Sequence, residues 1–458
     1  MDSGMAERVG TIIVGGGLAG LSCAVRLAQS GTDDVVVVEA TDRVGGRVRT
    51  ERYEGFTLDH GFQVLLTAYP ACRELLDYRA LRLRPFEPGA LIRQGGQFRL
   101  LGDPWRRPAQ ALSTALHPVG TWADKLRIAR LRARAAAGSL EQLYERPQSP
   151  TLERLRADGF SPRMIDQFFR PFLGGVFLDE SLACPSRMLE FVFRMFAGGD
   201  VAIPADGMDA IPRQLAERLP RGSLRLRSTA MEIETGDSGL GDSGIGGAAA
   251  STAAGAAGGP IRLRLGCGRR LVADRLVVAV ESDAAARLLG QPALKTEWAG
   301  TTNLYYASQN PPDRRRLLML RGDEQGPVQT AVVLSNVAPE YAPPGQALIS
   351  VSIDPGDSDP ELGDVDALDR HVLRQLGEWF GPQVSHWHRL PAFRVPCGLP
   401  RLSLDPIMAP TEVRRLHGQE IPEGKIYVCG DHRETPSIQG AMNSGLRVAD
   451  AILSTTPS

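Results

Sequence analysis

The stretch that decides the fold is TIIVGGGLAGLSCAVRLAQSG, residues 11–31. Its β-branched beginning, residues 11–14, predicts a short buried strand. The run from Leu18 to Gln29 predicts a helix, and Gly31 gives that helix a suitable end. A glycine-rich turn joins the strand to the helix. We therefore expect a strand–turn–helix unit of the kind that carries bound nucleotides.

The turn has the spacing G-x-G-x-x-G, with Gly15, Gly17 and Gly20. The first glycine permits a sharp turn, the second lets a pyrophosphate approach bare backbone, and the third lets the helix pack closely on the strand. The helix begins at Leu18 and Ala19, where free N–H groups and a partial positive charge suit a diphosphate. The turn predicts a dinucleotide site; the competing interpretation is a structural turn without a ligand.

A second strand, VVVVEA at residues 35–40, follows this helix. It ends at Glu39 and Ala40, and Glu39 stands nineteen residues after Gly20. A carboxylate at this place can accept hydrogen bonds from both hydroxyls of an adenosine ribose. The second strand therefore predicts a nucleotide that contains adenosine.

The next loop, ATDRVGGRVRT at residues 40–50, brings a second pair of glycines, Gly45 and Gly46. They allow the backbone to approach a ligand again, and the neighbouring arginines supply cations beside a diphosphate. A domain that binds only NAD does not need this second element. A larger dinucleotide, whose chain continues past the pyrophosphate, does.

These motifs resemble those of a known superfamily. The segments VGGGLAGL (14–21) and VVVVEATDRVGGRVRT (35–50) are similar to the FAD-binding start of flavin amine oxidases, protoporphyrinogen oxidases and carotenoid (phytoene) desaturases. The segment GDHRETPSIQGAMNSG (430–445) resembles the closing flavin motif of the same proteins. We place the chain nearest the desaturase-like branch, because Thr41 stands where amine-oxidase relatives often have arginine.

The resemblance implies FAD as the cofactor and assigns roles to residues. The first glycines would hold the pyrophosphate, Glu39 the adenosine ribose, and Asp431 the ribityl or pyrophosphate region. The helix that begins near Ile438 would aim its positive end at the flavin pyrimidine, where reduced flavin carries negative charge. Backbone of Ala230 and Met231 would meet the adenine. The full expected set is Gly15, Gly17, Leu18, Ala19, Gly20, Glu39, Ala40, Gly45, Gly46, Arg47, Gly61, Phe62, Gln63, Ala230, Met231, Gly430, Asp431, Ser437, Ile438 and Gln439.

We predict an α/β fold: a Rossmann-like (GR2-type) FAD-binding domain with an interleaved α+β substrate domain. The FAD-binding domain would be assembled from residues 8–70, 204–285 and 395–458. The substrate domain would consist of a helical part, 71–203, and a second part, 286–394. Within the middle segment, residues 236–260 are rich in Gly, Ala and Ser, which predicts a disordered insert.

Composition restricts the partners. The 458-residue chain has a formal net charge of −1, which gives no indication of nucleic acid binding. Its six cysteines are scattered and form no C-x-x-C pair, so we expect neither a metal site nor disulfide bonds. A reducing compartment fits best. Because the polar N-terminus runs into the first strand and no long apolar run follows, we expect a cytoplasmic protein, with membrane association possible.

Two segments bear on the substrate. FFRPFLGGVFLDE, residues 168–180, is rich in phenylalanine and predicts either the wall of an apolar substrate tunnel or an ordinary helical core. GTTNLYYAS, residues 300–308, matches the strand on which amine-oxidase relatives often carry a lysine, and it has none; Lys295 lies just upstream. We therefore expect an apolar small molecule as substrate, and oxygen or a quinone as electron acceptor.

Catalytic residues are not evident from the sequence. The weak candidates are His60, which follows the arginine-rich loop, and Tyr305 and Tyr306, which would point to opposite faces of their strand. Residues 105–135 carry Arg and Trp in amphipathic spacing, which suggests either peripheral contact with an anionic membrane or a solvated helix face.

Together these observations predict an FAD-dependent oxidoreductase that dehydrogenates an apolar, isoprenoid- or carotenoid-like substrate by hydride transfer to flavin N5. The alternatives are a flavin amine oxidase or a protoporphyrinogen-type oxidase and, from another class, a non-catalytic lipid carrier or escort protein. The presence of bound flavin would separate the last alternative from the others.

Overall fold

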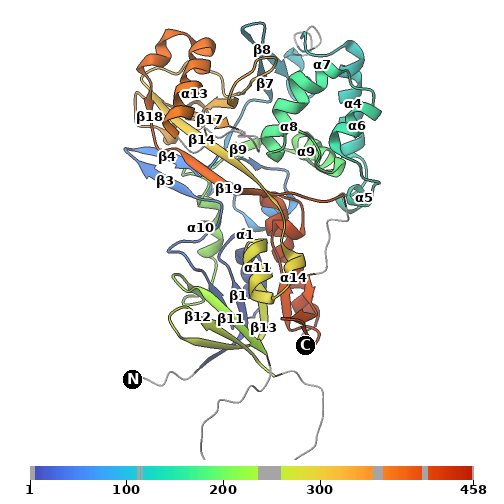
Figure 1. The fold of residues 1–458 in the computed structure, drawn as a ribbon, viewed down its shortest axis with the longest axis vertical. Helices are drawn as coiled ribbons and strands as arrows, with labels where there is room; N and C mark the ends of the chain where they lie inside the picture. Colours follow the sequence, from blue (N-terminus) through green and yellow to red (C-terminus); the bar gives the residue numbers. More distant parts are fainter. Residues whose placement is uncertain are drawn as a thin grey trace, which may run out of the picture.

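The computed structural model describes residues 6–32, 34–110, 114, 117–235, 259–353, 365–404 and 411–455. Figure 1 shows an elongated molecule with two parts stacked along its long axis. The first strand, β1 (Glu7–Val14), and the last helix, α14 (Ile438–Ser454), both lie in the lower part. All but the last two residues of the insert predicted at 236–260 lie outside the described residues.

The lower part is built on an eight-stranded sheet. Besides β1 it contains β2 (Val35–Val38), β10 (Leu224–Arg225), β11 (Ala230–Thr235), β12 (Ile261–Leu265), β13 (Arg270–Val278), β20 (Glu412–Val413) and β23 (Ile426–Val428). The strand order is β10-β2-β1-β13-β12-β11, and β23 joins beside the end of β13. Strands β10, β2, β1, β13 and β23 are parallel, whereas β11 and β12 are antiparallel. All four valines of β2 are buried, as a parallel strand with both faces covered requires.

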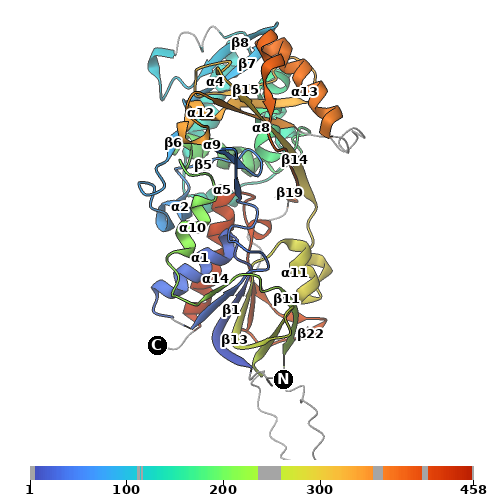
Figure 2. The ribbon, with the colours of Figure 1, turned by 90° about the vertical axis from the view of Figure 1, so that its left-hand side faces the viewer.

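Two helices, α1 (Leu18–Gln29) and α14, lie side by side on this sheet (Figures 1 and 2). They approach closely because glycine stands at the contacts. A Cβ added to Gly445 of α14 would lie 2.1 Å from the Ala19 carbonyl oxygen of α1. Helix α1 also packs closely on the turn before it, because a Cβ added to Gly20 would lie 2.0 Å from the Gly15 carbonyl oxygen. The predicted strand–turn–helix unit and the α/β class are confirmed. Three shorter helices complete this part: α2 (Pro70–Leu75), α10 (Ala210–Ala216) and α11 (Ser282–Leu289).

The upper part is built on a second eight-stranded sheet. Its strands are β7 (Gly89–Gln94), β8 (Gln97–Gly102), β14 (Trp298–Ser308), β15 (Leu318–Leu320), β16 (Val328–Val333), β17 (Ala347–Ile353), β18 (His388–Arg389) and β19 (Phe393–Pro400). The order is β18-β14-β17-β16-β15-β7-β8, with β19 also paired to β14. Every pair is antiparallel except β7 with β15.

Helices cover both faces of the upper sheet. One group consists of α4 (Trp122–Ala136), α5 (Leu140–Tyr144), α6 (Thr151–Ala157), α7 (Pro162–Met164), the π-helical turn η2 (Ile165–Phe169), α8 (Arg170–Phe177) and α9 (Ser186–Gly198). The other face packs on α13 (Val365–Phe380), which Figure 1 shows on the opposite side of the sheet. Tyr305 belongs to the core shared with the first group and Tyr306 to the core shared with α13. The two tyrosines therefore point to opposite faces of β14, as predicted.

The remaining short elements complete the two parts. They are β3 (Thr50–Tyr53), β4 (Phe56–Asp59), β5 (Leu65–Leu66), β6 (Arg84–Pro85), β9 (Val201–Ile203), β21 (Arg415–Leu416), β22 (Gln419–Glu420), α12 (Leu334–Val337) and the 3-10 turns η1 (Pro108–Gln110), η3 (Pro292–Leu294), η4 (Pro339–Tyr341), η6 (Pro382–His386) and η7 (Asp431–Arg433). Within the described ranges, none of the helices has the length and apolar character needed to cross a bilayer.

Two details of the predicted segments need correction. Residues 71–203 are predicted to be helical, but they include the antiparallel hairpin β7–β8. Gly95 and Gly96, both with positive φ, form the two-residue turn of this hairpin. Strand β19 crosses the predicted boundary at residue 395 and pairs with β14 of the upper sheet. The last segment of the lower sheet therefore begins later, at β20. The division into domains otherwise stays a prediction.

Candidate functional site

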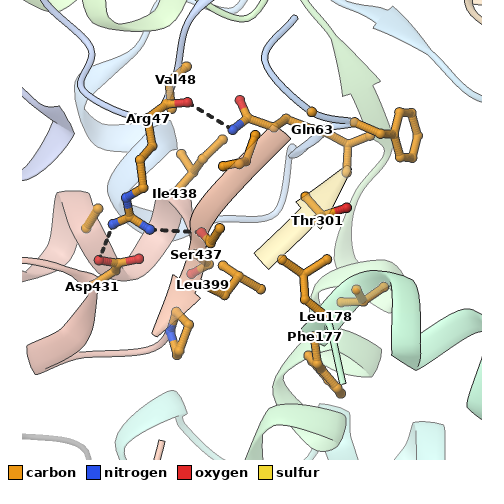
Figure 3. A pocket seen from close by; sticks show the side chains of 18 of the residues that line it. Arg47, Val48, Gln63, Phe177, Leu178, Thr301, Leu399, Asp431, Ser437 and Ile438 are labelled. Atoms are coloured by element: carbon orange, nitrogen blue, oxygen red, sulfur yellow. Dashed lines mark hydrogen bonds and ion pairs between the residues drawn. The ribbon is translucent and has the colours of Figure 1, made fainter. Parts of the chain in front are cut away.

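A cavity of about 340 Å³ lies between the two parts of the molecule. One end is formed by backbone turns of the lower part, and the other by side chains of α8, α9 and the upper sheet. Figure 3 shows side chains from both parts pointing toward the same space. Of the residues predicted to bind FAD, those that line it are Gly17, Leu18, Ala19, Gly45, Gly46, Arg47, Gly61, Phe62, Gln63, Gly430, Asp431, Ser437 and Ile438.

The three glycines of the first turn have different roles. Gly15 has φ of +112°, a conformation that side chains disfavour, and Gly20 has no room for a Cβ beside the Gly15 carbonyl. A Cβ added to Gly17, in contrast, would meet no heavy atom of the described residues within 4 Å. Gly15 and Gly20 therefore shape the turn, and Gly17 leaves open space at the N-terminus of α1.

Glu39 holds the end of β2 against this turn. Its carboxylate accepts hydrogen bonds from the Gly16 amide at 2.7 Å, the Thr41 amide at 2.9 Å and the Thr41 hydroxyl at 2.8 Å. Ala40 beside it is exposed. Neither residue is among those lining the cavity. The structure thus gives Glu39 a structural role that sequence reasoning missed, and its contact with a ribose stays a prediction.

The second glycine loop packs directly on the first. The Gly45 amide donates to the Gly16 carbonyl at 2.9 Å, and a Cβ added to Gly46 would come within 3.6 Å of the Gly17 Cα atom. Two stretches of bare backbone therefore face the same space. This is the arrangement expected where a phosphate chain approaches backbone from two sides.

Arg47 follows this loop and crosses the cavity (Figure 3). It donates to Asp431 Oδ1 at 2.5 Å and to the Gly398 carbonyl at 3.0 Å, and Glu281 lies 3.9 Å away. Burial opposes the charge of Arg47, but Asp431 and Glu281 outweigh it and raise the pKa of the guanidinium. The sequence separation of 384 residues between Arg47 and Asp431 explains why their pairing could not be predicted.

The loop from His60 to Gln63 forms another wall. His60 Nε2 lies 2.8 Å from Glu51 Oε1, and its ring stacks on Phe393 with the ring centroids 4.3 Å apart. Gln63 Nε2 donates to the Arg47 carbonyl at 3.3 Å. Gln63 Oε1 is buried and has no hydrogen-bond partner among the residues that the structure describes.

This loop is anchored by Asp59, the residue before it. Asp59 is buried and accepts hydrogen bonds from the Thr50 hydroxyl at 2.5 Å, the Tyr341 hydroxyl at 2.8 Å and the Met208 amide at 2.9 Å. Burial raises the pKa of its carboxyl, and these hydrogen bonds oppose that shift. The Asp59 carbonyl accepts from Tyr305, as described next. The cluster fixes the position from which the His60 loop reaches the cavity.

The tyrosine candidates do not reach the cavity. The Tyr305 hydroxyl donates to the Asp59 carbonyl at 2.8 Å, and the Tyr306 hydroxyl donates to Asp369 at 2.7 Å on the other face of the sheet. Both rings are fully buried, and neither is among the lining residues. Alternation along a strand gives opposite faces but not which neighbours cover them, and the structure does not bring either tyrosine to the cavity.

The closing motif supplies the last wall. Ser437 caps helix α14 by accepting from the Gly440 amide at 3.0 Å, and the helix N-terminus at Ile438 points into the cavity (Figure 3). Gln439 turns away instead, and its side chain accepts from the Ala71 amide at 2.9 Å. His432 lines the cavity, and burial lowers its pKa from 6.5 to about 4, against the raising effect of Asp431.

The strand predicted to meet the adenine lies farther out. Ala230 and Met231 begin β11, Met231 is 51% exposed, and neither lines the cavity. The chain just before them is nonetheless joined to the β2 end, because the Ser228 amide donates to the Glu39 carbonyl at 2.8 Å. Their contact with adenine stays a prediction.

The far end of the cavity is apolar. Helix α8, from the phenylalanine-rich segment, contributes Phe172, Val176 and Phe177, and Leu178 follows it in a left-handed conformation with φ of +53°. Sequence reasoning missed the matching residues of helix α9, because its apolar spacing is that of any buried helix. These residues are Met188, Phe191, Val192 and Phe196.

The residues of the cofactor end fit a flavin dinucleotide. Gln63 Oε1 and His432 Nε2 are buried polar atoms without hydrogen-bond partners among the described residues, and both belong to lining residues. Gly17 leaves the space that a phosphate chain needs, and helices α1 and α14 both begin at this end. A buried polar atom left unpaired is costly, so a ligand with hydrogen-bonding groups would complete the site.

Comparison with known proteins agrees with this geometry. The model of the family described as flavin containing amine oxidoreductase matches residues 18–453. Coproporphyrinogen III oxidase of Mycobacterium bovis is 28% identical over 229 residues, which is 46% of this chain and 45% of that protein. The 4,4'-diaponeurosporene oxygenase of Staphylococcus haemolyticus is 47% identical over 58 residues, 13% of this chain and 11% of that protein. The chain thus matches less than half the length of these curated relatives.

Among solved structures, a protein from Exiguobacterium sp. 255-15 assigned as a protoporphyrinogen oxidase superposes with a TM-score of 0.70 at 18% identity. The match covers 99% of this chain and 100% of that one. This likeness confirms the fold. Because the family model spans nearly the whole chain, the protein belongs to the flavin containing amine oxidoreductase family, within the superfamily that its sequence motifs predict.

Proposed function

We propose that this protein is an FAD-dependent oxidoreductase that dehydrogenates an apolar, isoprenoid- or carotenoid-like substrate. The observation that carries the proposal is the distribution of charge in the cavity. Among the described lining residues, the acidic and cationic side chains are Arg47, Glu281 and Asp431, and all three form one ion-paired group at the cofactor end. The opposite wall is built mostly from apolar side chains of α8 and α9, and the upper sheet adds only uncharged polar side chains, those of Thr301, Gln329, Thr330 and Ser352.

This wall favours hydrocarbon over a charged amine. Burying apolar surface contributes about 25 cal/mol per Å², so a long chain against Phe172, Phe177 and Val176 gains substantially. An ammonium group would lose hydration without meeting a carboxylate there. The apolar side chains also exclude water from the place where the substrate would be oxidised.

FAD, when bound, would be the group that accepts the hydride from the substrate. The proton that leaves the substrate needs a base, and His60 is suited to take it. Its Nε2 is hydrogen-bonded to Glu51, so in the neutral ring Nδ1 is the basic atom. Stacking on Phe393 fixes the plane of the ring. We expect oxygen or a quinone to be the final electron acceptor.

A second candidate is porphyrinogen oxidation, which the printed names of two relatives favour. A porphyrinogen also presents a large apolar ring, but its carboxylates need cations. A second cavity that adjoins the first is lined by Arg106, Lys125 and Arg132, which would meet these carboxylates, and also by Glu87 and Asp103. Oxidation of small amines is disfavoured by the missing carboxylate on the apolar wall.

Two measurements test the proposal. Heat extraction of purified protein followed by chromatography should release FAD. FMN alone would contradict the proposal, and no flavin in folded protein would contradict it in favour of the lipid carrier alternative. Anaerobic mixing should then bleach the flavin with a polyene in detergent but not with benzylamine or putrescine. Rapid bleaching by an amine with no response to polyenes would overturn the proposed substrate class, and bleaching by a porphyrinogen alone would select the second candidate.

A further inference from the structure

A second cavity, of about 530 Å³, lies beside the first. The two are adjacent because they share lining residues. The shared residues are Phe62, Val64, Phe172, Val176, Phe196 and Leu318. All six are apolar, so an apolar wall runs from one cavity into the other.

The outer end of the second cavity is bordered by exposed apolar side chains. Trp105, Trp122 and Leu126 all line it, and they are 49%, 63% and 73% exposed. Among the large apolar side chains of the described ranges, Trp122 and Leu126 have the greatest exposure. They stand one helical turn apart on α4, which lies on the outside of the upper part (Figure 1). An apolar surface thus extends from solvent into the interior.

Cations accompany these rings. Lys125 Nζ lies 5.1 Å from the ring centroid of Trp122, and Arg132 Cζ lies 5.1 Å from that of Trp105. Helix α4 carries five cationic residues and one acidic residue, Asp124, which is buried. Arg127, Arg132 and Arg134 are ion-paired with Asp124, Asp103 and Asp158. The exposed side of the helix therefore carries Lys125 beside Trp122 and the exposed Arg130 one turn after Leu126.

Tryptophan beside lysine and arginine, with a leucine projecting outward, is the composition of surfaces that rest in the headgroup region of a membrane. The excess of cationic over acidic residues on α4 complements an anionic bilayer. A protein partner would need neither this charge nor an apolar passage behind the contact.

We propose that Trp105, Trp122 and Leu126 form a docking surface for an anionic phospholipid bilayer, and that the second cavity is the inlet through which an apolar molecule passes from the bilayer to the first cavity. The docking surface does not depend on the proposed function. Only the identity of the molecule that enters through the inlet rests on the proposed function.

Flotation of the full-length protein with vesicles tests the docking surface. We expect binding to vesicles of equal parts phosphatidylglycerol and phosphatidylcholine, and at least tenfold weaker binding to phosphatidylcholine alone or at high salt. The double variant W122S/L126S should reduce binding to the mixed vesicles at least tenfold. Tyr53, 40% exposed on β3, provides the matched control Tyr53→Ser, which should bind as the parent does.

No binding by the parent protein, or equal loss in Tyr53→Ser and W122S/L126S, would overturn the docking surface. Self-association that W122S/L126S abolishes in the absence of vesicles, without vesicle binding by the parent, would also overturn it in favour of a second copy. Because Trp122 and Leu126 are exposed, we expect W122S/L126S to fold as the parent does. The flavin content of each variant checks this.

The inlet is tested by Ala129→Phe. Ala129 lines the second cavity and not the first, so a larger side chain there obstructs the passage. We expect unchanged vesicle binding and at least tenfold slower flavin reduction by a polyene carried in the vesicles. Parent-like reduction by this variant would overturn the inlet. If the parent binds vesicles and no polyene reduces its flavin, the proposed function fails while the docking surface stands.

Discussion

The two ends of the first cavity differ in what forms their walls: backbone at one end and side chains at the other. At the cofactor end, glycine turns and helix N-termini bring backbone to the surface of the cavity, and a lack of space dictates glycine at positions 15 and 20. At the substrate end, phenylalanine, valine and leucine side chains from α8 and α9 form the wall, and many apolar residues of similar size could replace them. The first kind of construction should be intolerant of small changes and the second tolerant. Four substitutions test that contrast.

The largest effect is expected from adding one methyl group to the glycine turn. In Gly20→Ala the new Cβ would stand 2.0 Å from the Gly15 carbonyl oxygen, so helix α1 must move away from β1. We expect a loss of about 3 kcal/mol or more in the free energy of unfolding, measured in urea, since overpacked cores commonly lose this amount. Gly17→Ala is the matched variant, because its Cβ enters open space. It should fold normally and retain less FAD; equal destabilisation by the two would break the contrast.

The next effect concerns His432 at the cofactor end. Its pKa is lowered from 6.5 to about 4, so between these values the unfolded chain binds a proton that the folded chain does not. Stability is therefore fully present above pH 6.5 and falls as the pH drops toward 4, by about 3 kcal/mol at most. His432→Gln cannot take up this proton. Urea unfolding from pH 7 to pH 4 should show a shallower slope in the variant, and an identical slope would contradict the assignment.

A somewhat smaller effect is expected from Glu39→Ala. The substitution leaves the Gly16 and Thr41 amides without their acceptor and removes the carboxylate predicted to bind the ribose. A charge-assisted hydrogen bond contributes about 1.5–3 kcal/mol, so FAD should bind roughly ten- to a hundredfold more weakly. Asp42→Ala is the control, because Asp42 is half-exposed and pairs with Arg43 at 3.4 Å. Unchanged affinity in Glu39→Ala would mean that the carboxylate contributes nothing to holding FAD.

The same contrast explains what the sequence could predict. The strand, turn and helix of residues 11–29 follow from local spacing, and the structure shows a steric reason for glycine at positions 15 and 20. The Arg47–Asp431 pair, the anchoring of the His60 loop by Asp59 and the contribution of α9 join residues far apart in sequence. Tyr305 shows the limit most clearly. That it would face away from Tyr306 on β14 was predictable, but that Asp59 would cover its face was not.

The smallest effect on stability is expected at the substrate end, from Phe172→Leu. Phe172 lines both cavities and packs against Phe168 and Phe196, with ring centroids 5.5 and 5.7 Å away. A flexible wall of side chains can readjust, so the free energy of unfolding should fall by about 1 kcal/mol and FAD content should not change.

The reaction should respond more than the fold does, because this ring stands where the two cavities meet. We expect flavin reduction by a polyene to slow about tenfold, the range found when one apolar contact of a substrate pocket is altered. Phe98→Leu is the matched control: Phe98 stacks on Phe380 with ring centroids 5.8 Å apart, in the core shared with α13. It should cost similar stability and leave reduction unchanged. If both variants slow reduction equally, the wall acts only through the stability of the upper part, and the division of labour between the two ends of the cavity is wrong.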